Sequence, residues 1–128
     1  MYISPQEMEH VSKLTPFARY EYFIKRVANF GEMYALRRDE EWLLAELDGH
    51  KLFPLWSAED FASKNAYGDW VDYKPVSIEL DVFNEEIIPL ISSSEYLINV
   101  FSVNQTSGFV VTHEEFMRDL SEELEKYD

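Results

Sequence analysis

The stretch from residue 16 to residue 30 most constrains the fold, because the residues that begin it, end it and form its buried face can all be recognised. Its apolar side chains recur with the 3.6-residue period of an α-helix; they are Phe17, Tyr20, Phe23, Ile24, Val27 and Phe30. Thr15 before Pro16 is typical of a helix start, and Gly31 is placed to end the helix. The opposite face of this predicted helix carries Arg19, Tyr22, Arg26 and Asn29.

Three strands are expected after this helix, at residues 32–37, 42–47 and 51–56. Asp48-Gly49 suits the positive φ angles of a tight hairpin, so we expect an antiparallel meander. Pro54 lies inside the third run. Because proline has no N–H to donate, we expect that strand to be an edge strand or to bend there.

Two short helices are expected in the connections. Ser57 with Asp60 three residues later resembles a capping arrangement, and it would open a helix that runs to about residue 66. Residues 76–80 alternate between apolar and polar, which is the period of a half-buried strand. Asp81 is then expected to cap a second helix, and Pro89 should bend or end it.

The last third of the chain predicts a hairpin and a closing helix. The hairpin strands are residues 96–103 and 109–112. Thr112 and Glu115 form a capping box, and the buried stripe of the helix is Phe116, Leu120, Leu124 and Tyr127. We therefore predict an α+β fold, with a mainly antiparallel sheet of five to six strands, N- and C-terminal helices packed on it and two short connecting helices. Residues 1–128 are expected to form a single domain, since their number is typical of one.

Charge is distributed unevenly along the chain. Residues 1–38 carry six basic and four acidic side chains, whereas residues 39–128 carry five and twenty-one. Such an anionic body repels nucleic acids and anionic membranes, so neither is expected as a partner. No run of apolar residues is long enough to span a membrane, and cysteine is absent, so we expect a cytoplasmic protein.

Recognisable catalytic and cofactor motifs are lacking. The three histidines have no companion at ligand spacing, and the four glycines are isolated, so no metal or nucleotide cofactor is expected. The serines at 92–94 lack the Gly-x-Ser-x-Gly elbow of a nucleophile. Adjacent glutamates such as Glu114 and Glu115 are interpreted as a solvated face rather than an acid-base pair.

The aromatic stretch around Trp70 is the predicted partner surface. Trp70 and Tyr73 lie in an irregular polar segment beside Asp69 and Asp72, and amphipathic aromatics with a polar rim are typical of protein-binding surfaces. Trp56, by contrast, is predicted to fill the core between sheet and helices.

Four short motifs carry a resemblance to a known family; they are Arg19-Tyr20-Glu21-Tyr22-Phe23, Leu52-Phe53-Pro54-Leu55-Trp56, Asp69-Trp70-Val71 and Val110-Val111-Thr112. With them the chain resembles, over about residues 16–127, a family of small bacterial proteins known as domain-of-unknown-function family 2750. A fainter likeness is to serine-sensitivity-enhancing proteins, which have a similar proline-bearing strand before a short helix. The resemblance implies a small α/β or α+β bacterial protein in the cytoplasm, and it transfers no catalytic residue.

The sequence favours a non-catalytic acidic protein-binding module. Its expected partner is a protein with a basic surface, for example a cationic toxin that an immunity-like inhibitor would bind, because complementary charge accelerates association. Self-association through the N-terminal helix is a second form of the same hypothesis. The alternative is a small cofactor-independent hydrolase or lyase, which would place a buried acid with a raised pKa in a closed apolar pocket.

Overall fold

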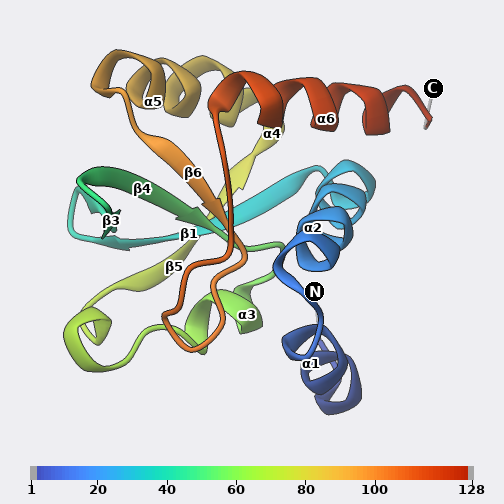
Figure 1. The fold of residues 1–128 in the computed structure, drawn as a ribbon, viewed down its shortest axis with the longest axis vertical. Coiled ribbons are helices and arrows are strands. Elements are labelled where there is room, and N and C mark those ends of the chain that lie inside the picture. Colours follow the sequence, from blue (N-terminus) through green and yellow to red (C-terminus); the bar gives the residue numbers. More distant parts are fainter. Residues whose placement is uncertain (1–2, 127–128) are drawn as a thin grey trace.

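Two small sheets form the centre of the structure, a computed structural model that describes residues 3–126 (Figure 1). The strands are β1 (Glu32–Arg38), β2 (Glu41–Trp42), β3 (Ala45–Leu47), β4 (His50–Leu55), β5 (Lys74–Glu79), β6 (Leu97–Val100) and β7 (Phe109–Val111). One sheet has the order β2-β1-β5 and the other the order β3-β4-β6-β7. An antiparallel bridge between Tyr34 and Trp56 joins β1 to the end of β4, and so joins the two sheets.

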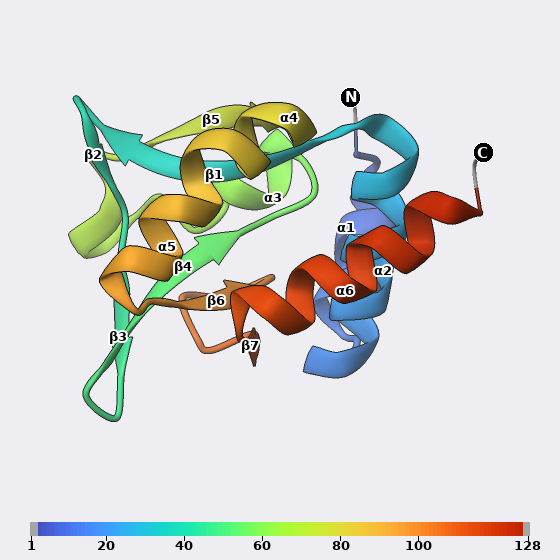
Figure 2. The same ribbon diagram turned by 90° about the horizontal axis from the view of Figure 1, so that it is seen from above.

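Helices cover both sides of these sheets. They are α1 (Pro5–Ser12), α2 (Pro16–Phe30), α3 (Glu59–Ser63), α4 (Leu80–Val82), α5 (Ile88–Ser94) and α6 (His113–Glu125), with a 3₁₀ turn η1 (Gly68–Trp70) and a π-helical segment η2 (Phe83–Ile87). Figures 1 and 2 show α4, α5 and α6 together on one side, α2 beside α6, and α3 on the opposite side of the sheets. The α+β class is confirmed, although the described part of the chain has seven strands, divided between two sheets.

The predicted start and end of α2 and the predicted start of α6 are confirmed. The Thr15 hydroxyl accepts a hydrogen bond from the Ala18 N–H at 3.2 Å, and Gly31 ends α2 in the left-handed region with φ 79°. Thr112 and Glu115 form the full capping box of α6. The stripe residue Tyr127 lies outside the described residues.

The expected strand at 42–47 is wrong, because the chain changes sheets within it. Residues 41–42 pair with β1, whereas residues 45–47 pair with β4 in the predicted hairpin at Asp48-Gly49. Leu43 between them is buried, and its N–H donates to the Leu36 carbonyl at 2.8 Å. Burying this leucine draws the chain across the core, so one apolar run yields two short strands.

The expectation that Pro54 marks an edge strand is also wrong, since β4 is an interior strand. It pairs antiparallel with β3 and parallel with β6, but the pairing with β3 extends only as far as Leu52. The Phe101 N–H donates to the Leu55 carbonyl, which places the peptide groups of odd-numbered β4 residues toward β6. The Pro54 nitrogen therefore points to the side where β3 has ended, and no ladder bond is lost.

The two short helices start differently from the prediction. In α3 the N-cap residue is Ala58, so Ser57 does not cap it; the Ser57 hydroxyl is buried without a hydrogen-bond partner, and Asp60 accepts from the Ile3 N–H at 3.1 Å. Asp81 does not cap the second helix, since the N-cap of α4 is Glu79 and Asp81 lies in its first turn. Pro89 does not end that helix, because it lies in the first turn of α5, where no N–H is needed, directly after the wider π-helical segment.

Aromatic side chains connect the layers in the core. The Phe23 and Phe116 rings lie 5.8 Å apart and the Phe116 and Phe83 rings 5.5 Å apart, which ties α2, α6 and η2 together. Trp56 is fully buried, and its indole N–H donates to the Ser102 carbonyl at 2.9 Å. Its predicted place in the core is therefore confirmed.

Replacing Gly108 with alanine should destabilise the β6–β7 hairpin. A Cβ at this position would lie 2.1 Å from the Val100 carbonyl oxygen, and this oxygen belongs to backbone that cannot rotate away. We expect the free energy of unfolding to fall by more than about 2 kcal/mol, measured by urea denaturation. The control is Ser107→Ala at the exposed neighbour, which should change it by less than about 0.5 kcal/mol; equal effects would contradict the close approach.

Candidate functional site

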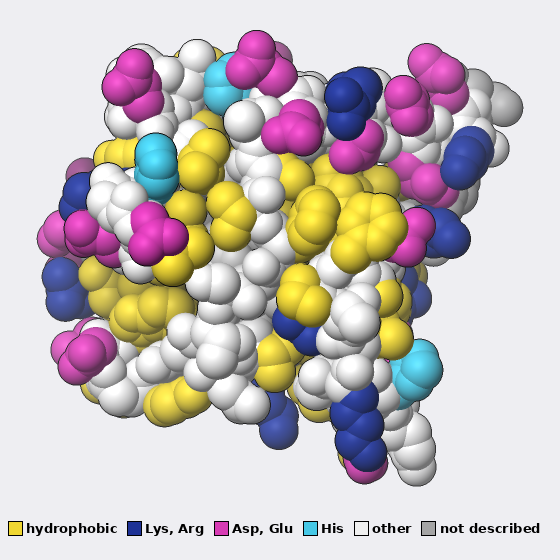
Figure 3. All heavy atoms as spheres, in the orientation of Figure 1, with side chains coloured by type: hydrophobic (Ala, Val, Ile, Leu, Met, Phe, Trp, Pro, Cys, Tyr) yellow, Lys and Arg dark blue, Asp and Glu magenta, His cyan; other side chains and the backbone are white. Residues whose placement is uncertain are grey.

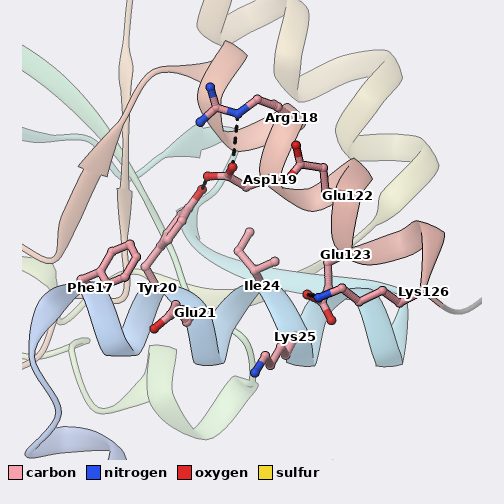
Figure 4. Close-up of a pocket in the computed structure, with 10 residues that line it drawn as sticks. All are labelled: Phe17, Tyr20, Glu21, Ile24, Lys25, Arg118, Asp119, Glu122, Glu123 and Lys126. Atoms are coloured by element: carbon pink, nitrogen blue, oxygen red, sulfur yellow. Dashed lines mark hydrogen bonds and ion pairs between the residues drawn. The ribbon is translucent and has the colours of Figure 1, made fainter.

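A groove of about 520 Å³ runs between α2 and α6 (Figure 4). Tyr20 and Ile24 reach into it from α2, and Asp119 and Glu123 from α6. The helical period of α2 places Tyr20 and Ile24 one turn apart on the same face, and α6 packs against that face. The groove is thus a direct product of how the two long helices meet.

A hydrogen bond between Tyr20 and Asp119 crosses the groove. The Tyr20 hydroxyl donates to Asp119 Oδ2 at 2.6 Å, and only 4% of Tyr20 is exposed. Burial, and then the bond to the Asp119 carboxylate, raise the pKa of the Tyr20 phenol well above its ordinary value. The phenol therefore remains a donor at physiological pH and fixes the position of the carboxylate.

At one end of the groove, the lining residues Phe17 and Tyr20 pack against Phe109; we call these three residues the aromatic end. The Tyr20 and Phe109 rings lie 4.8 Å apart, and the Phe17 and Phe109 rings 5.3 Å apart in an edge-to-face arrangement. Phe17 is 53% exposed, although the helical pattern assigned it to the buried face. An exposed phenylalanine held by two other rings presents a fixed apolar surface to a ligand.

The rest of the groove is lined by charged side chains. Arg118 Nε lies 3.3 Å from Asp119 Oδ1, and Lys126 Nζ lies 3.1 Å from Glu123 Oε1. Glu21 and Glu122 are exposed and make no ion pair within residues 3–126. Free carboxylates beside an aromatic surface suit a cationic ligand better than an anionic one.

Arg19, next to Tyr20, is buried although the helical pattern placed it on the polar face. It is 6% exposed, and it donates from Nε to the Phe101 carbonyl at 3.2 Å and from Nη1 to the Leu14 carbonyl. Desolvation lowers the pKa of the guanidinium. The described buried polar side chains are Arg19, Ser57, Asn65, Asn99 and Ser102, a set without a carboxylate.

The helices on the side of α6 form an acidic layer, defined as residues 80–95 and 113–126. These residues carry ten acidic and two basic side chains, and so eight of the fourteen net negative charges of the chain. Figure 3 shows Asp and Glu side chains along the edge formed by α5 and α6. The charge asymmetry in the sequence is therefore largely a property of this layer, which borders the groove.

The predicted partner surface around Trp70 is only partly exposed. Trp70 and Tyr73 are half-buried against the core, whereas Asp69 and Asp72 are exposed. The guanidinium of Arg38 lies 4.9 Å from the centre of the Tyr73 ring. The neighbouring side chains of Tyr67 and Val71 are 45% and 57% exposed, so apolar and acidic groups do lie together in this segment.

Residues 3–126 offer neither a cluster of metal ligands nor a helix that could span a membrane. No group of three or more histidine or acidic side chains in that range could hold a metal ion. His10, His50 and His113 belong to α1, β4 and α6. Within the same range, every helix is too short or too polar to cross a bilayer.

Sequence reasoning missed the groove because it treated the α2 stripe and the α6 acids separately. Phe17 and Tyr20 were assigned to the core, and the acids of α6 to a solvated face. One sequence signal for the exposure of Phe17 was its position in the first turn of its helix, where an apolar side chain can lie beyond the core. Nothing in the sequence pairs Tyr20 with Asp119, since 99 residues separate them.

The comparisons with known proteins give one family. The family model described as "Protein of unknown function (DUF2750)" matches residues 20–120. This range includes both partners of the Tyr20–Asp119 hydrogen bond. No curated protein matches the chain.

Removing the Tyr20 hydroxyl should loosen α6 from α2. In Tyr20→Phe the Asp119 carboxylate loses the Tyr20 donor but keeps that of Arg118 and stays partly exposed to water, so we expect a loss of about 1–1.5 kcal/mol in the free energy of unfolding. Chemical denaturation at pH 7 measures this loss. Tyr67→Phe, at an exposed tyrosine, is the matched control and should change stability by less than about 0.5 kcal/mol. A loss no larger than that of the control would contradict the bond.

Stability should also fall at alkaline pH. Burial, followed by the hydrogen bond to Glu7, raises the pKa of Tyr22 to about 12 from an ordinary value of 10.0. A phenol with a raised folded-state pKa contributes stability that is complete below pH 10 and is lost as pH rises toward 12. Urea denaturation at a series of pH values should show this decline, and Tyr22→Phe should make it shallower. An identical pH dependence in the variant would contradict the assignment.

Proposed function

The chain belongs to the DUF2750 family, and we propose that it is a non-catalytic module that binds a partner protein through the acidic layer and the adjacent groove. The observation that carries the proposal is the concentration of eight net negative charges on residues 80–95 and 113–126. Such a field attracts a basic surface and speeds its association, while it repels nucleic acid and anionic membranes. The proposed partner is therefore a protein with a basic surface, met in the cytoplasm.

The basic side chains of the chain support this proposal because many of them are engaged internally. Arg19 is buried, and Arg26 Nη2 lies 2.8 Å from Glu7 Oε2. Arg37 and Arg38 lie over the rings of Trp42 and Tyr73 at 5.1 and 4.9 Å. These four arginines are thus already in use within the fold, whereas eight of the ten acids of the layer are exposed.

The shape of the site also favours binding over hydrolysis. The alternative hydrolase or lyase needs an acid enclosed in an apolar pocket, because desolvation is what raises the pKa of a carboxyl group. In the groove, by contrast, the rim residues Glu21, Lys25 and Glu122 are exposed. Such a rim suits a partner that docks from solution.

A second contact with the partner is proposed at the Trp70 segment. Exposed Val71 and Tyr67 extend the apolar surface of half-buried Trp70, and Asp69 and Asp72 supply an acidic rim. A protein ligand that recognises both acids and aromatics could engage this segment as well as the groove.

The proposal is tested by two variants that carry the same net charge. The layer variant replaces Glu85, Glu122 and Glu125 with glutamine, and the control variant makes the same change at Glu9, Glu40 and Glu46; all six are exposed. Partners are trapped from native lysate at low salt by a zero-length carboxyl-to-amine cross-linker and identified by mass spectrometry. The binding of each purified partner is then measured by calorimetry.

We expect a basic protein that binds the wild type and the control variant equally but binds the layer variant with an about tenfold weaker Kd, as three contacts of about 0.5 kcal/mol each would give. Binding should also weaken as salt is added. Equal loss in both variants would show that net charge alone matters, and purified partners without a basic surface would contradict the proposal.

A further inference from the structure

We infer that the aromatic end of the groove binds one cationic side chain, an arginine or a lysine, of the partner protein. This inference rests on the proposed function and assigns a particular residue chemistry to the groove. The site consists of the exposed ring of Phe17, supported by Tyr20 and Phe109, and of the carboxylates of Asp119 and Glu21. Figure 4 shows Tyr20 extending from α2 to Asp119, with Phe17 beside Tyr20.

The chemistry of the aromatic end and of the neighbouring carboxylates suits a cation for two reasons. The face of an aromatic ring is electron-rich and attracts an ammonium or guanidinium within about 6 Å of its centre. A carboxylate beside the ring adds a charge-assisted hydrogen bond to the same group. Tyr20 keeps Asp119 in place as an acceptor, because its hydroxyl donates to Oδ2 at 2.6 Å and its pKa is raised.

Arginines of the protein itself cover two accessible rings, those of Phe30 and Tyr73, whereas among residues 3–126 no cation lies over the exposed rings of Phe17 and Tyr67. Arg26 lies 5.2 Å from the centre of the Phe30 ring, and Arg38 lies 4.9 Å from that of Tyr73. Phe30 is 47% exposed and Phe17 is 53% exposed, on the same helix. Among residues 3–126, the cations found over rings are Arg26, Arg37 and Arg38, and none of them covers Phe17.

Arg118 indicates how a cation from the partner would be held, and also competes with it. Its Nε lies 3.3 Å from Asp119 Oδ1, on an exposed side chain. An ion pair between exposed neighbours is weak, so a cation that also covers the Phe17 ring can displace it. Removing the Arg118 charge should therefore strengthen binding, a direction that a purely structural role of Arg118 does not predict.

The test uses a single cation, Nα-acetyl-arginine amide, and its uncharged analogue Nα-acetyl-citrulline amide. Two-dimensional NMR spectra of the ¹⁵N-labelled protein are followed during titration with each. We expect shifts centred on residues 17–21, 109 and 119 for the arginine compound, and an at least about fivefold weaker affinity for the citrulline compound.

Matched variants distinguish binding at the aromatic end from binding elsewhere on the acidic layer. Phe17→Ala should weaken the arginine compound about two- to fivefold, Phe30→Ala should leave its Kd unchanged, and Arg118→Gln should tighten it. Thermal unfolding verifies that each variant is folded. We expect both phenylalanine variants to fold, because both side chains are largely exposed.

Three results would overturn the inference: shifts spread along α5 and α6 without an effect of Phe17→Ala, equal affinity for the citrulline compound, or no shifts at all. The first would leave the proposed function standing with binding through the layer alone. Failure of the layer variant to lose a basic partner would, in contrast, remove the proposed function itself.

Discussion

The position of α2 depends on the buried guanidinium of Arg19, which forms no ion pair with a carboxylate of residues 3–126. Because a buried charge needs its donors satisfied, Arg19 must stay within reach of the Leu14 and Phe101 carbonyls. This holds α2 against the loop after β6, where Phe101 adopts a left-handed φ of 67°. The next residue, Tyr20, then points to α6 and bonds to Asp119. Two consecutive side chains thereby fix the width of the groove.

Basic and acidic side chains have different roles in this protein, and the sequence alone does not reveal the difference. Several basic groups stabilise the fold, through buried hydrogen bonds at Arg19, an ion pair at Arg26 and ring contacts at Arg37 and Arg38. Ten of the twenty-five acidic groups lie on the helical layer. Most of these ten are exposed, and an exposed carboxylate contributes little to folding stability. A surface that is both highly charged and structurally dispensable is available for binding a partner.

Local chemistry made much of the fold predictable. Thr15, Gly31 and the Thr112–Glu115 capping box define helix ends through contacts within four residues, and the Asp48-Gly49 turn defines a hairpin in the same way. The division at Leu43 and the interior place of Pro54 depend on distant strands, and local patterns do not contain that information.

The candidate site was less predictable than the fold, for the same physical reason. The groove depends on the approach of α2 to α6, and its central bond joins residues 99 positions apart. The Trp70 segment could be found from composition, since its aromatics and acids are adjacent in sequence. The burial of this segment could not be predicted, because the packing of Trp70 and Tyr73 against the core is a tertiary property.

The central claim is that the aromatic end of the groove holds a cation. The most direct measurement is a crystal structure of the protein grown with Nα-acetyl-arginine amide. We expect the guanidinium over the Phe17 ring, within about 6 Å of its centre, with a hydrogen bond to Asp119 or Glu21. A guanidinium bound only elsewhere on the acidic layer would contradict the claim, as would a groove in which Arg118 remains the sole cation at Asp119 at saturating ligand.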